Sequence, residues 1–141
     1  MLPRRAAVVL AGWTLFVWTT RIGNIWRDDA ATTSSKVGST ALALSFTVLA
    51  LVVLFTAWRR AWAALRLAVV GLGVWTTAVW IVRSLTILAG DRATGFKIVH
   101  GALAVVSVAL AAWAVRTVRR ADDVDDVGPD PTAAVPAGTA L

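Results

Sequence analysis

Four long apolar stretches constrain the fold of this chain more than any other feature. They cover residues 6–26, 37–58, 67–90 and 98–115. A helix needs roughly 20 mostly apolar residues to cross about 30 Å of hydrocarbon. Because 58% of the residues are hydrophobic and only 16% are charged, too little polar surface remains for a soluble domain, which carries about 25% charged residues. The sequence therefore predicts an all-α bundle of four transmembrane helices.

Basic residues at the ends of these stretches predict the orientation in the membrane. Eight of them flank the stretches on one side: Arg4, Arg5, Arg59, Arg60, Arg66, Arg116, Arg119 and Arg120. Four flank them on the other side, accompanied by three Asp: Arg27, Lys36, Arg92 and Lys97, with Asp28, Asp29 and Asp91. Since cytoplasmic loops carry an excess of Lys and Arg, we expect a multi-pass protein of the bacterial plasma (inner) membrane with its N- and C-termini in the cytoplasm. No motif accompanies the net charge of +6 that would predict a nucleic-acid partner.

The two halves of the chain share a pattern of Trp, Arg and Asp residues. At an offset of 62 residues, the matching positions are Trp13 and Trp75, Trp18 and Trp80, Arg21 and Arg83, and Asp29 and Asp91. At an offset of 61, the second stretch of each half also aligns, and Lys36 matches Lys97. We interpret the chain as two tandem two-helix hairpins, residues 1–66 and residues 67–120. Because each repeat crosses the membrane twice, both copies have the same orientation, and a pseudo-two-fold axis along the membrane normal is expected.

Residues 121–141 differ in composition from the rest of the chain. Five Asp and three Pro fall within ADDVDDVGPDPTAAVPAGTAL, which has no apolar periodicity. Such a segment buries too little apolar surface to offset the entropy of ordering its backbone. We therefore expect a disordered, acidic cytoplasmic tail.

Small residues in the second and fourth stretches are expected to let neighbouring helices approach closely. These residues are Thr40, Ala43, Thr47, Ala50, Gly101, Ala104 and Ala111. No GxxxG motif is present, so no particular helix pair is predicted from them.

Arg21 and Arg83 are charged residues within apolar stretches, at equivalent positions of the two halves. Each lies eight residues before an Asp, Asp29 or Asp91, which is roughly 12 Å of helix from the outer boundary. An Arg at the centre of a membrane helix costs about 2.5 to 3.5 kcal/mol, although a side chain near the helix end can extend to the headgroups. Two interpretations follow. Each Arg anchors its helix at the boundary, or both form a cationic site between the halves that binds an anionic lipid or substrate.

Tryptophan, histidine and aspartate side chains near these arginines are further candidates for contacts. Trp18 and Trp80 precede the arginines by three residues, so they offer a cation–π surface or fill the bundle core. His100 opens the fourth stretch, where we expect an interfacial hydrogen-bonding role or, alternatively, a proton relay with Asp91 or Lys97. Asp29 and Asp91 are expected to be solvated loop charges, because two short loops rarely supply the six or so oxygen ligands of a cation site.

The inventory of reactive side chains argues against catalysis. The chain contains no Cys, a single His and a single Met. Without Cys, neither thiol chemistry nor a thiolate metal site is possible, and a single His cannot supply both axial ligands of a haem. The sequence also shows no nucleophile–base pair, metal cluster or phosphate-binding loop. It therefore predicts no catalytic residues, no metal and no cofactor.

Two short segments carry a pattern that points to a known family. They are VWTTRIGNIWRDD at residues 17–29 and FKIVHGALAVVSVAL at residues 96–110. The positions that carry the pattern are Asn24, Trp26 and Asp28 in the first half, and Phe96, Val99, His100, Leu103 and Ala104 in the second. Here the chain resembles a family of small actinobacterial two-helix integral membrane proteins of unknown function, as if one member had been duplicated. The resemblance implies a membrane location and a topology, and it implies no activity.

An integral plasma-membrane protein without enzymatic activity is the function that these features favour. We expect an accessory, structural or lipid-contacting subunit whose partners are the bilayer, anionic lipid included, and another membrane protein or further copies of the chain. The alternative is a small transporter or channel component that uses Arg21 and Arg83 as a cationic site between pseudo-symmetric halves. Small four-helix multidrug exporters rely on a membrane-embedded Glu, and this chain has no Glu.

The charge asymmetry predicts where both ends of each hairpin lie. Because basic flanks favour the cytoplasmic side, alkaline phosphatase should be active when fused at Thr33 and inactive when fused after Leu141. Green fluorescent protein at the same two positions should give the opposite pattern. Phosphatase activity after Leu141 would contradict the assignment.

Overall fold

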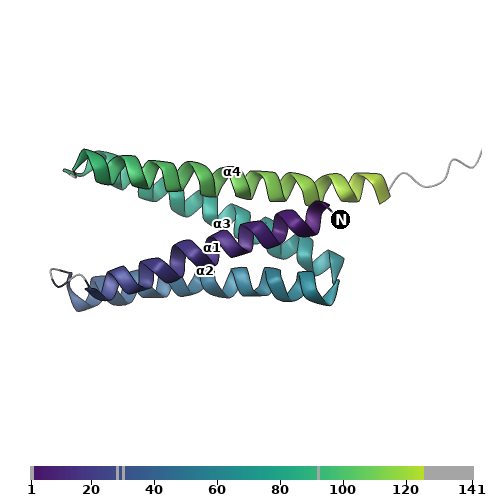
Figure 1. The fold of residues 1–141 in the computed structure, drawn as a ribbon, viewed down its shortest axis with the longest axis horizontal. Helices are drawn as coiled ribbons and strands as arrows, with labels where there is room; N and C mark the ends of the chain where they lie inside the picture. The colour runs from purple at the N-terminus through teal and green to yellow at the C-terminus, as the bar shows by residue number, and fades with distance from the viewer. Residues whose placement is uncertain (1, 28, 30, 92, 126–141) are drawn as a thin grey trace, which may run out of the picture.

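The computed structural model describes residues 2–27, 29, 31–91 and 93–125, which form a bundle of four helices (Figure 1). The helices are α1 (Leu2–Arg27), α2 (Thr33–Arg59), α3 (Trp62–Ala89) and α4 (Thr94–Asp125). Each of them is long and apolar enough to cross a membrane, and no strand occurs in the described part of the chain. The predicted all-α, four-helix bundle is therefore confirmed, and its four apolar helices are those of a multi-pass membrane protein.

The helices form two hairpins that pack side by side. α1 packs against α2, and α3 packs against α4. The hairpins then meet along two seams, one between α1 and α4 and the other between α2 and α3. Each helix therefore has two main neighbours, and the bundle has an up-down-up-down arrangement with short connections (Figure 1).

Every helix begins four or five residues before the apolar stretch that predicts it, and α4 also ends later than predicted. The α2–α3 connection is only Arg60 and Ala61, and α3 begins at Trp62, so Arg66 lies within a helix and not in a loop. Arg60 adopts the left-handed conformation with φ 57°, and its backbone N–H donates to the Ala57 carbonyl, which closes α2 without a glycine. At its C-terminal end, α4 continues to Asp125, five residues into the predicted tail. The remaining tail, residues 126–141, lies outside the described residues.

The buried positions of the two hairpins coincide at the offsets seen in the sequence. At an offset of 62, the buried residues of α1 and α3 pair as Ala7 with Val69, Leu10 with Leu72, Ala11 with Gly73, Thr14 with Thr76 and Trp18 with Trp80. At an offset of 61, those of α2 and α4 pair as Phe46 with Ser107, Ala50 with Ala111, Val53 with Ala114 and Ala57 with Val118. Equivalent helices therefore turn equivalent faces toward the core.

Each seam between the hairpins contains one Trp–Ser hydrogen bond. Trp13 Nε1 donates to Ser107 Oγ at 2.9 Å across the α1–α4 seam. Trp75 Nε1 donates to Ser45 Oγ at 3.1 Å across the α2–α3 seam. Lipid offers such groups no competing partners, and interhelical hydrogen bonds in membranes contribute about 0.6 kcal/mol on average. The two bonds therefore hold the halves together in addition to the packing of the core.

An aromatic stack fills the core beside these bonds. The Trp18 ring lies 4.1 Å from the Phe46 ring with only 9° between their planes. Trp18 and Trp80 are both buried, whereas Trp75 is 39% exposed. The predicted core role is thus confirmed for Trp18 and Trp80, and Trp75 lies at the lipid-facing edge of its seam.

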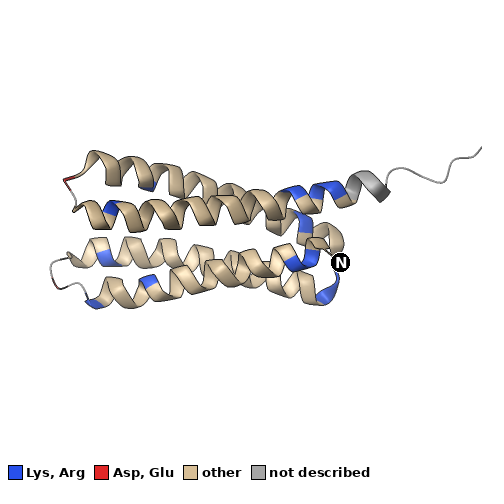
Figure 2. Ribbon diagram, turned by 45° about the horizontal axis from the view of Figure 1, so that its top comes forward, with Lys and Arg blue, Asp and Glu red and all other residues tan. Residues whose placement is uncertain are grey.

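Charged residues divide the bundle into two unlike ends (Figure 2). Eight basic residues lie where α1 and α3 begin and where α2 and α4 approach their C-terminal ends. They are Arg4, Arg5, Arg59, Arg60, Arg66, Arg116, Arg119 and Arg120. We call this the basic end. The opposite end, which we call the distal end, carries the α1–α2 and α3–α4 connections. Arg21 and Arg83 lie between the two ends, closer to the distal end.

α3 and α4 approach each other closely at Gly73. A Cβ atom added to Gly73 would lie 2.8 Å from Val115 Cγ2, and the Ala111 carbonyl oxygen would be 3.8 Å away. Gly101, which the sequence indicated as a close-approach residue, has open space around it. The prediction for Gly101 was wrong because its exposed face of α4 points away from the neighbouring helices, which residue size alone does not reveal.

Gly73→Ala should destabilise the bundle, because the new methyl group overlaps with a β-branched side chain that has little rotameric freedom. We expect a loss of about 1 to 2 kcal/mol, after the gain in helix propensity of Ala over Gly, measured as a lower unfolding temperature in detergent. Gly71→Ala is the matched control, since nothing lies within 4 Å of its added Cβ, and it should be neutral or stabilising. Val115→Ala should rescue Gly73→Ala. Equal stability of the two Ala variants would contradict the close approach.

Candidate functional site

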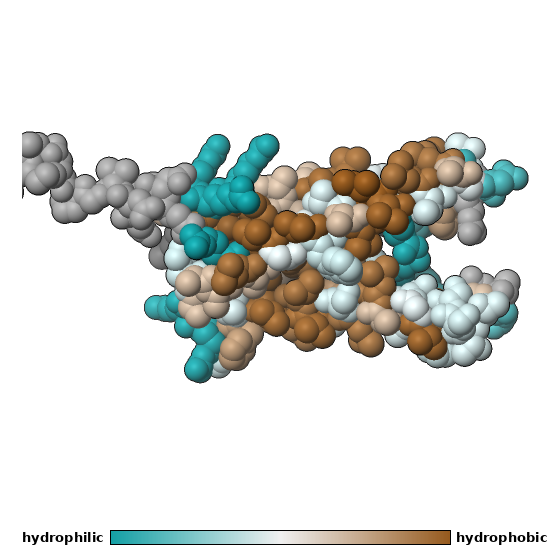
Figure 3. All heavy atoms as spheres, turned by 180° about the vertical axis from the view of Figure 1, so that it is seen from behind, coloured by the Kyte–Doolittle hydropathy of each residue, from teal (hydrophilic) through white to brown (hydrophobic). Residues whose placement is uncertain are grey.

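A pocket opens between the two hairpins at the distal end of the bundle. Its volume is about 580 Å³, and all four helices contribute to its wall. The lining residues are Arg21, Asn24, Ile25, Ala31, Ser35, Lys36, Ser39, Arg83, Thr86, Ile87, Phe96 and His100. Figure 3 shows a hollow at this end, with hydrophilic surface between two largely hydrophobic halves. We call it the distal pocket.

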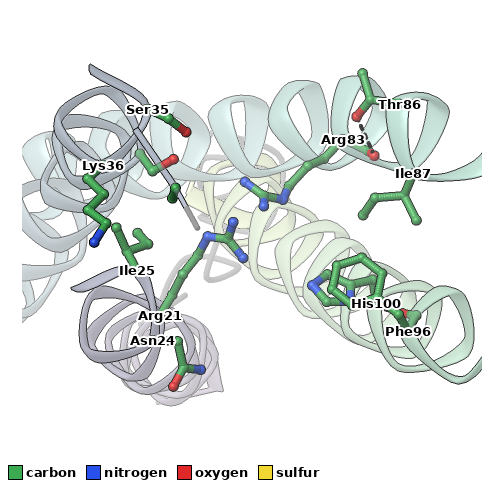
Figure 4. Close-up of a pocket in the computed structure, with 12 residues that line it drawn as sticks. Arg21, Asn24, Ile25, Ser35, Lys36, Arg83, Thr86, Ile87, Phe96 and His100 are labelled. Atoms are coloured by element: carbon green, nitrogen blue, oxygen red, sulfur yellow. Dashed lines mark hydrogen bonds between the residues drawn. The ribbon is translucent and has the colours of Figure 1, made fainter. Parts of the chain in front are cut away.

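Arg21 and Arg83 reach into the distal pocket from opposite hairpins. Arg21 comes from α1 and Arg83 from α3, and Figure 4 shows their guanidinium groups pointing toward one another. Both side chains are half-buried. The Arg21 Nε atom is buried and has no hydrogen-bond partner in the described structure. The two arginines that the sequence aligns at equivalent positions therefore meet in one site.

The electrostatic character of the distal pocket is positive. Lys36 contributes a third cation from α2, and among the residues that the structure describes, none that lines the pocket is an Asp or Glu. Asp29 and Asp91 are exposed in the two connections and line neither this pocket nor the one beside it. This exposure agrees with the prediction that both residues are solvated loop charges. No acidic side chain of the lining can therefore neutralise the arginines.

His100 lies at the rim of the distal pocket that α4 forms. Its Nδ1 lies 2.9 Å from the Phe96 carbonyl oxygen, and since a carbonyl can only accept, Nδ1 is the donor. The imidazole also stacks on the Phe96 ring, with 3.8 Å between the ring centres. These two contacts hold the ring in place beside the arginines. They also agree with the predicted hydrogen-bonding role of His100. Within the described residues, no hydrogen bond joins His100 to Asp91.

Most of the lining residues occupy equivalent positions in the two hairpins. The pairs are Arg21 and Arg83, Asn24 and Thr86, and Ile25 and Ile87 at an offset of 62, with Ser35 and Phe96, and Ser39 and His100, at an offset of 61. Among these ten residues, only the Arg pair and His100 were predicted from the sequence as candidates for contacts. The missed residues share the same offsets, so extending the alignment one helical turn beyond each Arg would have found Asn24 and Thr86. The stacking of Phe96 on His100 has no such signal.

A second, smaller pocket adjoins the distal pocket. Its volume is about 230 Å³, and it shares Arg21, Asn24, Arg83 and His100 with the first. Trp18 and Trp80 contribute to its wall. The Trp residues that the sequence placed near the arginines thus lie beside the site, about one helical turn farther from the distal end.

The side chains of the distal pocket suit an anion better than a metal ion. No group of three His, Cys, Asp or Glu side chains in the described chain is placed to hold a metal. The lining supplies instead hydrogen-bond donors from guanidinium, ammonium, amide and hydroxyl groups. A guanidinium offers five donors in a planar fork that matches carboxylate and phosphate oxygens. The chemistry that this arrangement can perform is the binding of an anionic group.

Comparisons with protein-family models, with curated proteins and with solved structures give no match for this chain. The resemblance of residues 17–29 and 96–110 to small actinobacterial membrane proteins therefore stays a prediction. The site must be interpreted from its own geometry.

Replacing either pocket arginine should stabilise the empty protein. Arg21→Leu and Arg83→Leu each remove a half-buried charge that has no acidic neighbour in the pocket, so we expect a gain of about 1 to 2 kcal/mol in anion-free detergent. Thermal unfolding of the purified variants measures this. Arg27→Leu, at an exposed position of the same helix, should change stability little. A large loss of stability in both pocket variants would show that the arginines have structural partners instead.

Proposed function

We propose that this chain is a plasma-membrane protein that binds an anionic group in the distal pocket and acts without enzymatic activity, as an accessory or lipid-contacting protein. The observation that carries the proposal is the meeting of Arg21 and Arg83, from separate hairpins, in one pocket whose described lining contains no acidic residue. A phosphate or carboxylate placed between them would receive bidentate hydrogen bonds from both sides.

The energetics of the arginine pair support binding over simple anchoring. An Arg that only anchors its helix to the headgroups can do so on any lipid-facing side. These two side chains instead point toward one another, although like charges repel and each loses hydration in the pocket. An arrangement that is unfavourable when empty and favourable when filled is typical of binding sites.

The matched burial and pocket pairs support the duplicated architecture as part of the proposal. We infer that residues 1–66 and 67–120 are two copies of one hairpin, related by a pseudo-two-fold axis along the bundle. The distal pocket would then lie on that axis. An anion on the axis would interact equally with both halves and would favour their association. A membrane-protein partner or a second copy of the chain would contact the exposed apolar faces.

The basic end supports an orientation with both termini in the cytoplasm. In that orientation the distal pocket lies in the outer leaflet of the plasma membrane, about two helical turns below its surface. The anionic group would then reach the site from the outer face or from the lipid of that leaflet.

A transporter component is the second candidate function, because the pocket lies between two halves and is lined by residues near one end of the bundle. The core toward the basic end is closed by buried Leu65, Val69 and Val118. Transport would require one hairpin to rock against the other. That movement would break the Trp13–Ser107 and Trp75–Ser45 hydrogen bonds. Anion flux into proteoliposomes, absent in the accessory function, separates the two candidates.

Native mass spectrometry of three matched double variants tests the proposed site. Arg21→Leu with Arg83→Leu should insert normally and lose roughly tenfold or more of the bound anionic lipid that the wild type retains. Arg21→Lys with Arg83→Lys keeps the charge but not the fork, so it should retain an intermediate amount. Arg119→Leu with Arg120→Leu removes the same charge from exposed positions of the basic end and should retain lipid like the wild type.

Unchanged retention in the double Leu variant of the pocket would eliminate the anion site. Arg21 and Arg83 would then be topological anchors only. Equal losses in the pocket variant and in the basic-end control would show that net charge, and not the pocket, holds the lipid.

A further inference from the structure

The smaller pocket has a polar end and an apolar end. Four of its residues, Arg21, Asn24, Arg83 and His100, also line the distal pocket. The others are Phe16, Val17, Trp18, Thr20, Trp80, Val99 and Leu103. We call this second set, which comes from α1, α3 and α4, the apolar groove. The two cavities therefore adjoin at residues that include both arginines.

The apolar groove offers hydrocarbon contacts and few hydrogen bonds. Thr20 is its one hydroxyl, and that hydroxyl donates to the Phe16 carbonyl at 2.8 Å, so it is satisfied within α1. The wall formed by Trp18 is rigid, because its ring stacks on Phe46. A polar ligand would lose hydration here without compensation, whereas an alkyl chain would not.

The groove is open to the lipid along the α1–α4 seam. Phe16 on α1 is 63% exposed, and Val99 on α4 is 56% exposed. Both line the groove, so its side faces the surroundings of the bundle and not the closed core. A chain that is already in the membrane can therefore enter laterally, without crossing the distal end.

The order of these residues along the helices matches the polarity of a membrane lipid. On α1, Asn24 is toward the distal end and Phe16 is two turns deeper, and on α3, Arg83 is toward the distal end and Trp80 is about one turn deeper. On α4, Val99 lies level with His100, and Leu103 is about one turn deeper. Positive charge thus lies near the boundary and apolar surface lies toward the middle of the bilayer. A lipid of the distal leaflet has its headgroup and its chains in the same order.

From this geometry we propose that the ligand of the distal pocket is an anionic membrane lipid, whose phosphate or carboxylate lies between Arg21 and Arg83 and whose acyl chain lies in the apolar groove. The inference rests on the proposed anion site and deepens it, because it names the class of ligand. A soluble anion would use the distal pocket alone. The charge at one end of the groove and its lateral opening at the other favour the lipid.

A chain-length series on the wild-type protein tests this without any substitution. The probes share a terminal phosphate group: inorganic phosphate, and the three phosphate monoesters glycerol 3-phosphate, dihexanoyl phosphatidic acid and dioctanoyl phosphatidic acid. Binding is measured by calorimetry in a neutral detergent, with the matching phosphatidylcholines as controls. Affinity should rise by roughly tenfold or more from glycerol 3-phosphate to dioctanoyl phosphatidic acid, as methylene groups become buried. The phosphatidylcholines should bind far more weakly.

Substitutions that fill the groove provide the structural arm of the test. Val99→Trp places a large side chain in the groove and should abolish the gain with chain length while leaving phosphate binding unchanged. Val105→Trp is the matched control, since Val105 is 69% exposed on the same helix and lines neither cavity. It should behave like the wild type.

The outcomes separate failure of the inference from failure of the proposed function. If all phosphate probes bind the wild type equally and Arg21→Leu with Arg83→Leu abolishes their binding, the anion site stands and the lipid assignment is overturned. If no phosphate probe binds and the double Leu variant behaves like the wild type, the proposed function itself fails. If Val99→Trp disturbs the fold, the wild-type series decides, and a flat series overturns the inference.

Discussion

The bilayer interior cannot hydrogen-bond to a protein backbone, and the rest of this structure depends on that constraint. Each crossing segment must satisfy its own polar groups as a helix, and lipid provides no hydrophobic force that drives helices together. Close packing and a few interhelical hydrogen bonds must therefore supply the cohesion. The contact at Gly73 provides such packing within one hairpin, and the Trp13–Ser107 and Trp75–Ser45 bonds connect the two hairpins.

The same constraint explains why the arginine pair needs a compensating partner. Charge is costly at this depth, so two guanidinium groups that meet between the hairpins need a compensating partner. The residues described around the pocket provide none, because no Asp or Glu is among them, and a bound anion is the partner that this chemistry favours. The apolar groove adjoins the arginine pair, and its exposed residues Phe16 and Val99 face the bilayer. The packing that holds the bundle together and the proposed lipid site thus both involve the seam between α1 and α4.

Much of this arrangement could be predicted from the sequence, because hydrophobic length and paired rare residues are local signals. The four helices and the equivalence of Arg21 and Arg83 follow directly from them. The side of each helix that faces its neighbours does not, since apolar residues cover every face of a membrane helix. For that reason Gly101 was misjudged, and the close approach at Gly73 was not anticipated. The stacking of His100 on Phe96 depends on rotamers and on backbone geometry that composition does not encode.

The most direct test of a shared anion site is the NMR response of the arginine side chains themselves. With ¹⁵N-arginine in nanodiscs, the Nε resonances of Arg21 and Arg83 can be assigned by Arg→Lys substitution and followed while phosphatidic acid replaces phosphatidylcholine. Both resonances should shift together along one binding curve, while the resonances of the exposed Arg119 and Arg120 at the basic end change little. Movement of only one pocket resonance, or of all arginines in proportion to the surface charge, would contradict a site formed by the two hairpins together.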